Sequence, residues 1–106
     1  MVFAAAEYNG PVYIRMGRLD VETIFDEATY DFQIGIANTV REGNDVTIAA
    51  TGLMTAEALK AADILAQEGI SVRVINVGTI KPLDGETILK AAQETKFIIT
   101  AEEHSV

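Results

Sequence analysis

The chain has 106 residues, of which 49% are apolar, so it is long enough for one modest domain with a buried core and too short for two. Its 16 acidic and 8 basic residues give a formal net charge of −8, which argues against binding to nucleic acid or to anionic membranes. No apolar run approaches the roughly 18 residues of a membrane helix. The absence of cysteine excludes disulfides and thiolate metal sites and suits a cytoplasmic location.

The first third of the chain predicts little regular structure. Residues 1–8 have the apolar spacing of the back half of a helix, which Asn9-Gly10 would end. Pro11 opens a predicted strand that runs through Ile14. Residues 19–31 are acidic with weak periodicity and contain no basic residue, which is typical of a solvated linker.

From residue 32 the sequence becomes that of a folded domain. Residues 32–52 predict two short extended pieces with a bulge at Gly35 and a turn at residues 42–45. The run VTIAAT at residues 46–51 is apolar on both faces of the strand. This is the pattern of a parallel strand that helices cover on both sides.

Two helices and two further strands follow. Thr55 is the predicted N-cap of a helix that Gly69 ends, with Glu57 in its first turn. Its narrow apolar stripe consists of Ala58, Ala61, Ala62 and Leu65. Residues 71–77 and 97–100 predict strands. Between them, Asp84 is the predicted N-cap of a second helix whose inner side carries Ile88, Leu89 and Ala92.

The order strand, helix, strand, helix, strand predicts an α/β fold, a three-layer, doubly wound and mostly parallel sheet. The first helix has no N-cap, and the chain reaches residue 106 soon after a strand. We therefore expect the fold to be incomplete at both ends and to be part of a larger protein. An uncovered last strand predicts association through its edge.

Ligands of parallel α/β sheets gather at the carboxyl ends of the strands. Here these ends are Thr51-Gly52, Gly78-Thr79 and residues 102–104. Neither a phosphate-binding loop nor a dinucleotide-binding glycine motif is present, so Gly52 is interpreted as a turn residue. His104 and Glu102 would share one face of an extended strand. They are candidates for an interface or for contact with a ligand, whereas a metal site built from them would be incomplete.

Arg15 and Arg18 follow the predicted strand at residues 11–14 and are the other candidate site. An arginine donates two parallel hydrogen bonds to a phosphate or carboxylate, so Arg15 at a strand end could hold a substrate phosphate. Salt bridges to the acidic linker are the alternative, and spacing alone does not decide between them.

Three segments of the chain resemble the C-terminal part of transketolases. In chain order they are PVYIRMGR, REGNDVTIAATGLMTAEALKAADILAQEGISVRVINVGTIKPLDGETILKAA and TAEEH. The resemblance is closest to the separately encoded C-terminal subunits of split bacterial and archaeal enzymes. It implies that residues 1–18 end a pyrimidine-binding domain, that residues 19–31 are an interdomain linker, and that residues 32–106 are most of the C-terminal domain.

The resemblance also implies an activity. The intact enzyme would transfer a two-carbon ketol unit between sugar phosphates, using thiamine diphosphate and Mg²⁺. Arg15, and less firmly Arg18, would contact the substrate's phosphate. The family's G-D-G motif and activating glutamate are missing, so we expect this chain to be inactive alone and to bind no cofactor. Its partner would be the N-terminal thiamine-binding part or subunit, in a homodimer or heterotetramer.

Two alternatives stay open from the sequence. The region from residue 32 could be a non-catalytic module for dimerisation or regulation, because it is acidic and poor in motifs. The chain could also belong to a related thiamine diphosphate enzyme such as 1-deoxyxylulose-5-phosphate synthase, whose donor is pyruvate.

Overall fold

The computed structural model describes residues 1–14 and 33–103. The elements in chain order are α1 (Val2–Glu7), β1 (Asn38–Arg41), β2 (Val46–Ala50), α2 (Met54–Gln67), β3 (Val72–Asn76), α3 (Gly85–Glu94) and β4 (Phe97–Ala101). Arg15, Arg18 and His104 lie outside the described residues, as does the predicted linker at residues 19–31.

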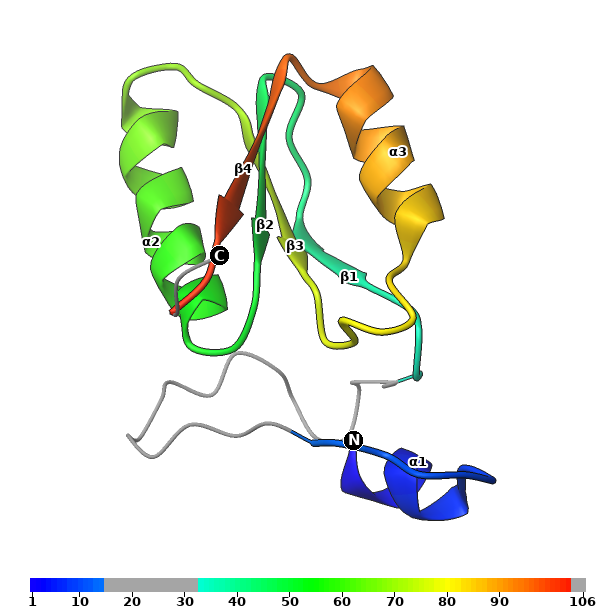
Figure 1. Ribbon diagram of the computed structural model, residues 1–106. Helices are drawn as coiled ribbons and strands as arrows, with labels where there is room; N and C mark the ends of the chain where they lie inside the picture. The colour runs from blue at the N-terminus through cyan, green and yellow to red at the C-terminus, as the bar shows by residue number, and fades with distance from the viewer. Residues whose placement is uncertain (15–32, 104–106) are drawn as a thin grey trace.

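The described strands form one four-stranded sheet in the order β1-β3-β2-β4. β2 pairs in parallel with both β3 and β4, and β1 pairs antiparallel with β3. The helices α2 and α3 lie on opposite sides of this sheet (Figure 1). The prediction of a three-layer, mostly parallel α/β fold is therefore confirmed.

Each face of the sheet has its own apolar core because successive side chains of a strand point to opposite faces. One core joins the sheet to α2, and its buried members are Ile48, Ala50, Ala58, Ala62, Val72 and Val74. The other core joins the sheet to α3 and contains Ala37, Ala49, Ile75, Val77 and Ala91. Along β2 and β3, buried residues belong to one core or the other according to the face of the sheet on which they lie. Strands that are apolar on both faces predict this arrangement.

The helix α2 begins two residues earlier than predicted, at Met54. Its N-cap is Leu53, and no side chain caps it. The prediction that Thr55 is the N-cap was wrong, because Thr55 is fully buried against the sheet. Its hydroxyl instead donates to Oδ1 of Asn76 in β3 at 2.9 Å, which satisfies a group that would be costly to bury alone. The predicted end at Gly69 is confirmed, since this residue has a φ of +83°.

The helix α3 begins after Asp84 as predicted, and the Asp84 side chain accepts from the amide of Thr87. The predicted inner face was partly wrong. Ile88 packs on the core beside the buried Ala91, whereas Leu89 is 64% exposed, and Ala92 is exposed as well. The inward positions 88, 91 and 95 have helical spacing, so the face is rotated by about one position from the predicted one.

Two predicted features near the start of the chain are corrected by the structure. Residues 11–14 are not a strand, and they pair with no strand among the described residues. Gly35 lies in a turn with a φ of +86°. The irregularity of register lies instead between Thr39 and Arg41, where β1 pairs with β3.

The turn predicted at residues 42–45 is confirmed between β1 and β2. It lies against the start of β3, because the carbonyl of Ser71 accepts from the amides of Asp45 (2.9 Å) and Val46 (3.2 Å). The buried Arg73 of β3 also binds this turn and links it to α3. Its Nε donates to the carbonyl of Gly43 at 3.2 Å, and its guanidinium also donates to Glu94 at 3.1 Å.

Candidate functional site

The carboxyl ends of β2, β3 and β4 lie at one edge of the sheet, because these three strands are parallel. Backbone hydrogen bonds continue the pairing just beyond the strands. The amide of Val77 donates to Ala50 at 2.9 Å, and the amide of Thr51 donates to Ala101 at 3.2 Å. This edge is where ligands of parallel α/β sheets bind, so it is the candidate site within the described residues.

Gly52 lies at this edge between β2 and α2. It has a φ of +55°, and a Cβ placed there would meet no atom within 4 Å. The left-handed backbone is what a glycine accommodates without strain. This supports the interpretation that Gly52 serves the turn.

The loop between β3 and α3 is tied to the segment that enters β1. Oδ2 of Asp84 accepts from the amide of Ala37 at 2.9 Å and from the hydroxyl of Thr87 at 2.6 Å. The hydroxyl of Thr79 accepts from the amide of Gly35 at 3.0 Å. The two contacts fix residues 35–37 against the carboxyl edge. The hydrogen bond from Thr87, together with that from Ala37, lowers the pKa of Asp84 below its ordinary value.

We expect the stability of the domain to depend on this carboxylate. A lowered pKa in the folded state stabilises the fold above the unfolded pKa of about 3.9, and this contribution is lost as the pH falls through the folded value. Replacing Asp84 by alanine should therefore cost about 0.5–2 kcal/mol at pH 7, the range for loss of an N-cap. The cost should be smaller at pH 3.

Urea unfolding of the unmodified chain and of Asp84→Ala, at pH 7 and at pH 3, measures the cost of the substitution at each pH. Glu86→Gln is the matched control, because Glu86 also lies in the first turn of α3 but is exposed. A cost for Asp84→Ala that is the same at both pH values would contradict the inference that the ionised Asp84 carboxylate stabilises the fold.

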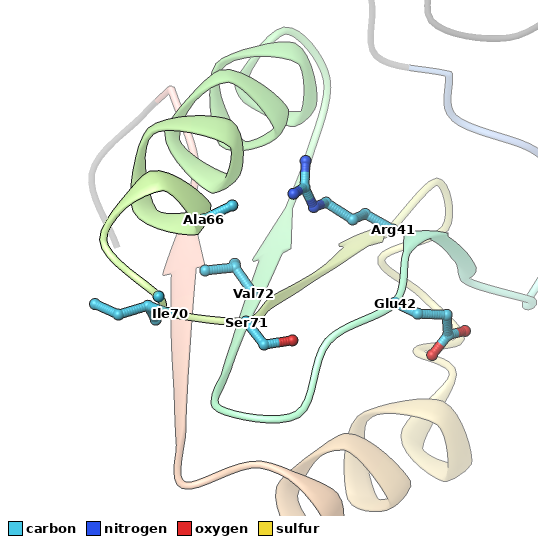
Figure 2. A pocket seen from close by; sticks show the side chains of 7 residues that line it. Arg41, Glu42, Ala66, Ile70, Ser71 and Val72 are labelled. Carbon is cyan, nitrogen blue, oxygen red and sulfur yellow. The ribbon is translucent and has the colours of Figure 1, made fainter.

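A surface hollow of about 280 Å³ lies elsewhere, at the amino end of β3. Its lining consists of Arg41, Glu42, Ala66, Gly69, Ile70, Ser71 and Val72. Figure 2 shows the Arg41 side chain reaching toward α2, whereas Glu42 points away from the hollow. Arg41 is paired with Asp63 of α2, so its charge is already compensated. The hollow lies at the opposite end of the strands from the carboxyl edge, and few polar groups converge in it, so it is a poor candidate for a ligand site.

Of the four predicted site residues, the structure describes Glu102 alone. It follows the end of β4 at the carboxyl edge, and it is exposed. The roles of Arg15, Arg18 and His104, and any contact between His104 and Glu102, stay predictions.

The described residues do not fit thiamine diphosphate or its metal ion. Within residues 1–14 and 33–103, no three histidine, cysteine, aspartate or glutamate side chains are grouped to hold a metal. In the same residues, every buried side-chain nitrogen and oxygen has a hydrogen-bond partner. Asp84, Thr79 and Thr55 at the carboxyl edge are engaged in contacts within the domain.

None of the described helices is long and apolar enough to cross a membrane.

The fold defines a three-layer α/β domain whose sheet, as in other parallel α/β sheets, offers its carboxyl edge for ligands. Residues 35–106 match the family model described as "Transketolase, C-terminal domain". The chain belongs to this family, which confirms the resemblance found in its sequence.

Similar proteins agree with this assignment. The chain is 50% identical over 99 residues to a 6-deoxy-6-sulfo-D-fructose transketolase subunit, SqwH, of Clostridium sp. (strain MSTE9), which covers 93% of the chain and 30% of that protein. It is 45% identical over 105 residues to a 1-deoxy-D-xylulose-5-phosphate synthase of Heliobacterium modesticaldum (strain ATCC 51547 / Ice1), covering 98% of the chain and 16% of that enzyme.

A solved structure titled "Split gene transketolase, inactive beta4 tetramer" superposes with a TM-score of 0.94 at 48% identity. The match covers 99% of this chain and 35% of that one. The chain thus spans about a third of the length of the Clostridium subunit and of this solved chain.

Proposed function

We propose that this chain is the C-terminal part of a transketolase, a transferase that moves a two-carbon ketol unit from a ketose phosphate to an aldose phosphate. The observation that carries the proposal is the family match over residues 35–106. Identity of 50% to the Clostridium transketolase subunit, over 93% of the chain, supports it.

Within this enzyme, the role of residues 1–18 is to hold the anionic end of the substrate. Arg15 donates two hydrogen bonds to the phosphate, and Arg18 supplies a second cation. The Clostridium relative is named for a sugar that carries a sulfo group. A guanidinium fork suits a sulfonate as well as a phosphate, because both present several acceptor oxygens with negative charge.

Thiamine diphosphate supplies the carbanion chemistry of such a reaction when it is bound. The described residues do not fit that cofactor, so in this proposal it and Mg²⁺ are held by the N-terminal thiamine-binding part or subunit. The assembly is a homodimer or heterotetramer in the cytoplasm, and the chain alone is inactive. The similar solved chain is titled an inactive tetramer of its own kind, which supports both the self-association and the inactivity.

A related synthase is the second candidate. The 45% identity to the Heliobacterium 1-deoxy-D-xylulose-5-phosphate synthase covers 98% of the chain. In that case the donor is pyruvate, and Arg15 contacts the phosphate of the acceptor. Assaying the intact enzyme with pyruvate and with a ketose phosphate as alternative donors separates the two candidates.

Deleting residues 32–106 from the intact enzyme tests whether the domain contributes to assembly. We expect the subunits to dissociate at higher concentration and turnover to fall more than about tenfold, the factor that corresponds to 1.4 kcal/mol. Sedimentation and steady-state assays measure the two quantities. Full assembly with unchanged turnover would show that the domain is dispensable, and would favour a regulatory module.

A further inference from the structure

The loop between β3 and α3 presents apolar side chains to solvent at the carboxyl edge of the sheet. Ile80 and Leu83 of this loop are exposed, and so is Ile36 on the segment that enters β1. We call these three residues the apolar patch. Single exposed apolar residues are normal on a protein surface, but several on neighbouring segments mark a contact surface.

The two segments that carry the apolar patch are fastened together. The amide of Gly35 donates to the hydroxyl of Thr79, and the amide of Ala37 donates to Oδ2 of Asp84. These two hydrogen bonds lie on either side of Ile36 in the sequence. The backbone of the patch is therefore fixed before a partner binds, so little conformational entropy is lost on binding.

The start of the chain indicates which partner lies nearby. The helix α1 has six residues, and none of them is buried. Its apolar side chains Val2 and Phe3 are exposed. An isolated helix this short is unstable in water, so α1 needs a packing partner outside the described residues. Figure 1 shows α1 beyond the carboxyl edge, apart from the layers of the domain.

The similar solved chain supports such a partner. Its superposition covers 99% of this chain, and so includes both α1 and the domain. The same match covers 35% of the solved chain, so most of that chain lies outside the matched part.

The partner of α1 is also tethered close to the apolar patch. In the sequence, residues 15–32 join the segment that contains α1 to the segment that contains Gly35 and Ile36. A contact between two parts of one polypeptide is intramolecular, so a small apolar area is sufficient to maintain it.

We propose that the part of the same polypeptide that packs on α1 also docks on the apolar patch, through apolar side chains that cover Ile36, Ile80 and Leu83. The contact fixes the carboxyl edge relative to the rest of the enzyme. This inference rests on the proposed function only in that the chain is part of a longer enzyme. It requires neither Arg15 nor a particular substrate.

Hydroxyl-radical footprinting of the intact enzyme tests the proposal, because isoleucine and leucine side chains are oxidised according to their exposure to solvent. The chain supplies matched controls on its two long helices. Ile64 on α2 is 62% exposed and Ile80 is 63% exposed. Docking should make the oxidation of Ile80 at least about fivefold slower than that of Ile64, because the core of an interface is buried. Leu83, which is 55% exposed, should likewise react more slowly than Leu89 on α3, which is 64% exposed.

A charged variant of the intact enzyme tests the same contact by breaking it. Ile80→Asp/Leu83→Asp places two carboxylates without partners in an apolar contact, which is costly, so the docked part should separate. Oxidation of Ile36 should then become faster than in the unmodified enzyme. Ile64→Asp/Leu89→Asp is the matched control and should leave the oxidation of Ile36 unchanged. Circular dichroism checks that each variant is folded.

Two results would overturn the proposal. One is an unmodified enzyme in which Ile80 and Leu83 are oxidised as fast as their matched controls. The other is a folded Ile80→Asp/Leu83→Asp enzyme in which the oxidation of Ile36 is unchanged. The footprinting uses no substrate, so a failure of the proposed phosphate contact at Arg15 would leave these rates unaffected.

Discussion

Replacing Gly43 by alanine is expected to cost more than about 3 kcal/mol in the free energy of unfolding, at the upper end of overpacking effects. A Cβ at this position would lie 2.2 Å from the carbonyl carbon of Val72, 2.4 Å from the amide nitrogen of Arg73 and 2.6 Å from the carbonyl oxygen of Val72. All three are backbone atoms of β3, so no side-chain rotation can relieve the overlap.

The surrounding hydrogen bonds hold the turn against β3. The carbonyl of Gly43 accepts from Arg73, and the next residues are bonded to Ser71 through the amides of Asp45 and Val46. Moving the turn away to make room for a methyl group would break these bonds. It would also leave the buried guanidinium of Arg73 without one of its acceptors, which is costly.

Chemical denaturation of the unmodified chain and of Gly43→Ala measures the loss in the free energy of unfolding. Gly85→Ala is the matched control, because a Cβ there meets no atom within 4 Å. Gly85 has no positive φ and begins α3, so this change should be neutral or stabilise by up to about 1 kcal/mol. A Gly43→Ala protein with the same denaturation midpoint as the unmodified chain would show that the close approach of turn and strand is wrong.

The sequence was sufficient to predict the layers of the fold because its strands and helices have clear periods. VTIAAT is apolar on both faces, and it became β2 between two cores. The helix signals at Asp84 and Gly69 were also reliable, since both act through local backbone geometry.

The errors fall where tertiary contacts override local preference. Thr55 has the chemistry of an N-cap, but burial directs its hydroxyl to Asn76 on another strand. The strand predicted before Arg15 has β-forming residues, yet a strand needs a partner, and none pairs with residues 11–14 in the described part of the chain. Periodicity contains no information about such long-range partners.

Contacts that tie distant segments were also missed. Arg73 stands alone among the apolar residues of β3, and this single charge was the available signal of a buried polar contact. Its acceptors, Gly43 and Glu94, are distant in sequence and could not be identified from spacing. The contact between Asp84 and Ala37 spans 47 positions and was unpredictable for the same reason.

Arg15→Ala in the intact enzyme is expected to have the largest effect on catalysis. Hydrogen bonds to a charged group contribute about 1.5–3 kcal/mol, so kcat/KM for a phosphorylated substrate should fall about 10- to 100-fold. Under the proposed function, Arg15 would bind a phosphate away from the reacting carbons and hold it equally in the ground and transition states, so most of the loss should appear as a higher KM. Arg15→Lys should lose less, since it keeps the charge but not the fork.

Arg41→Ala is the matched control. Arg41 is an arginine of the same chain whose partner is Asp63 on α2, and its replacement should leave the kinetics unchanged.

The most direct test compares KM of the Arg15→Ala enzyme for a ketose phosphate and for the corresponding unphosphorylated ketose. The proposed phosphate contact predicts that KM rises at least about tenfold for the phosphorylated substrate and stays within about twofold for the unphosphorylated one. Equal increases for both substrates would contradict it and would assign Arg15 to salt bridges within the protein.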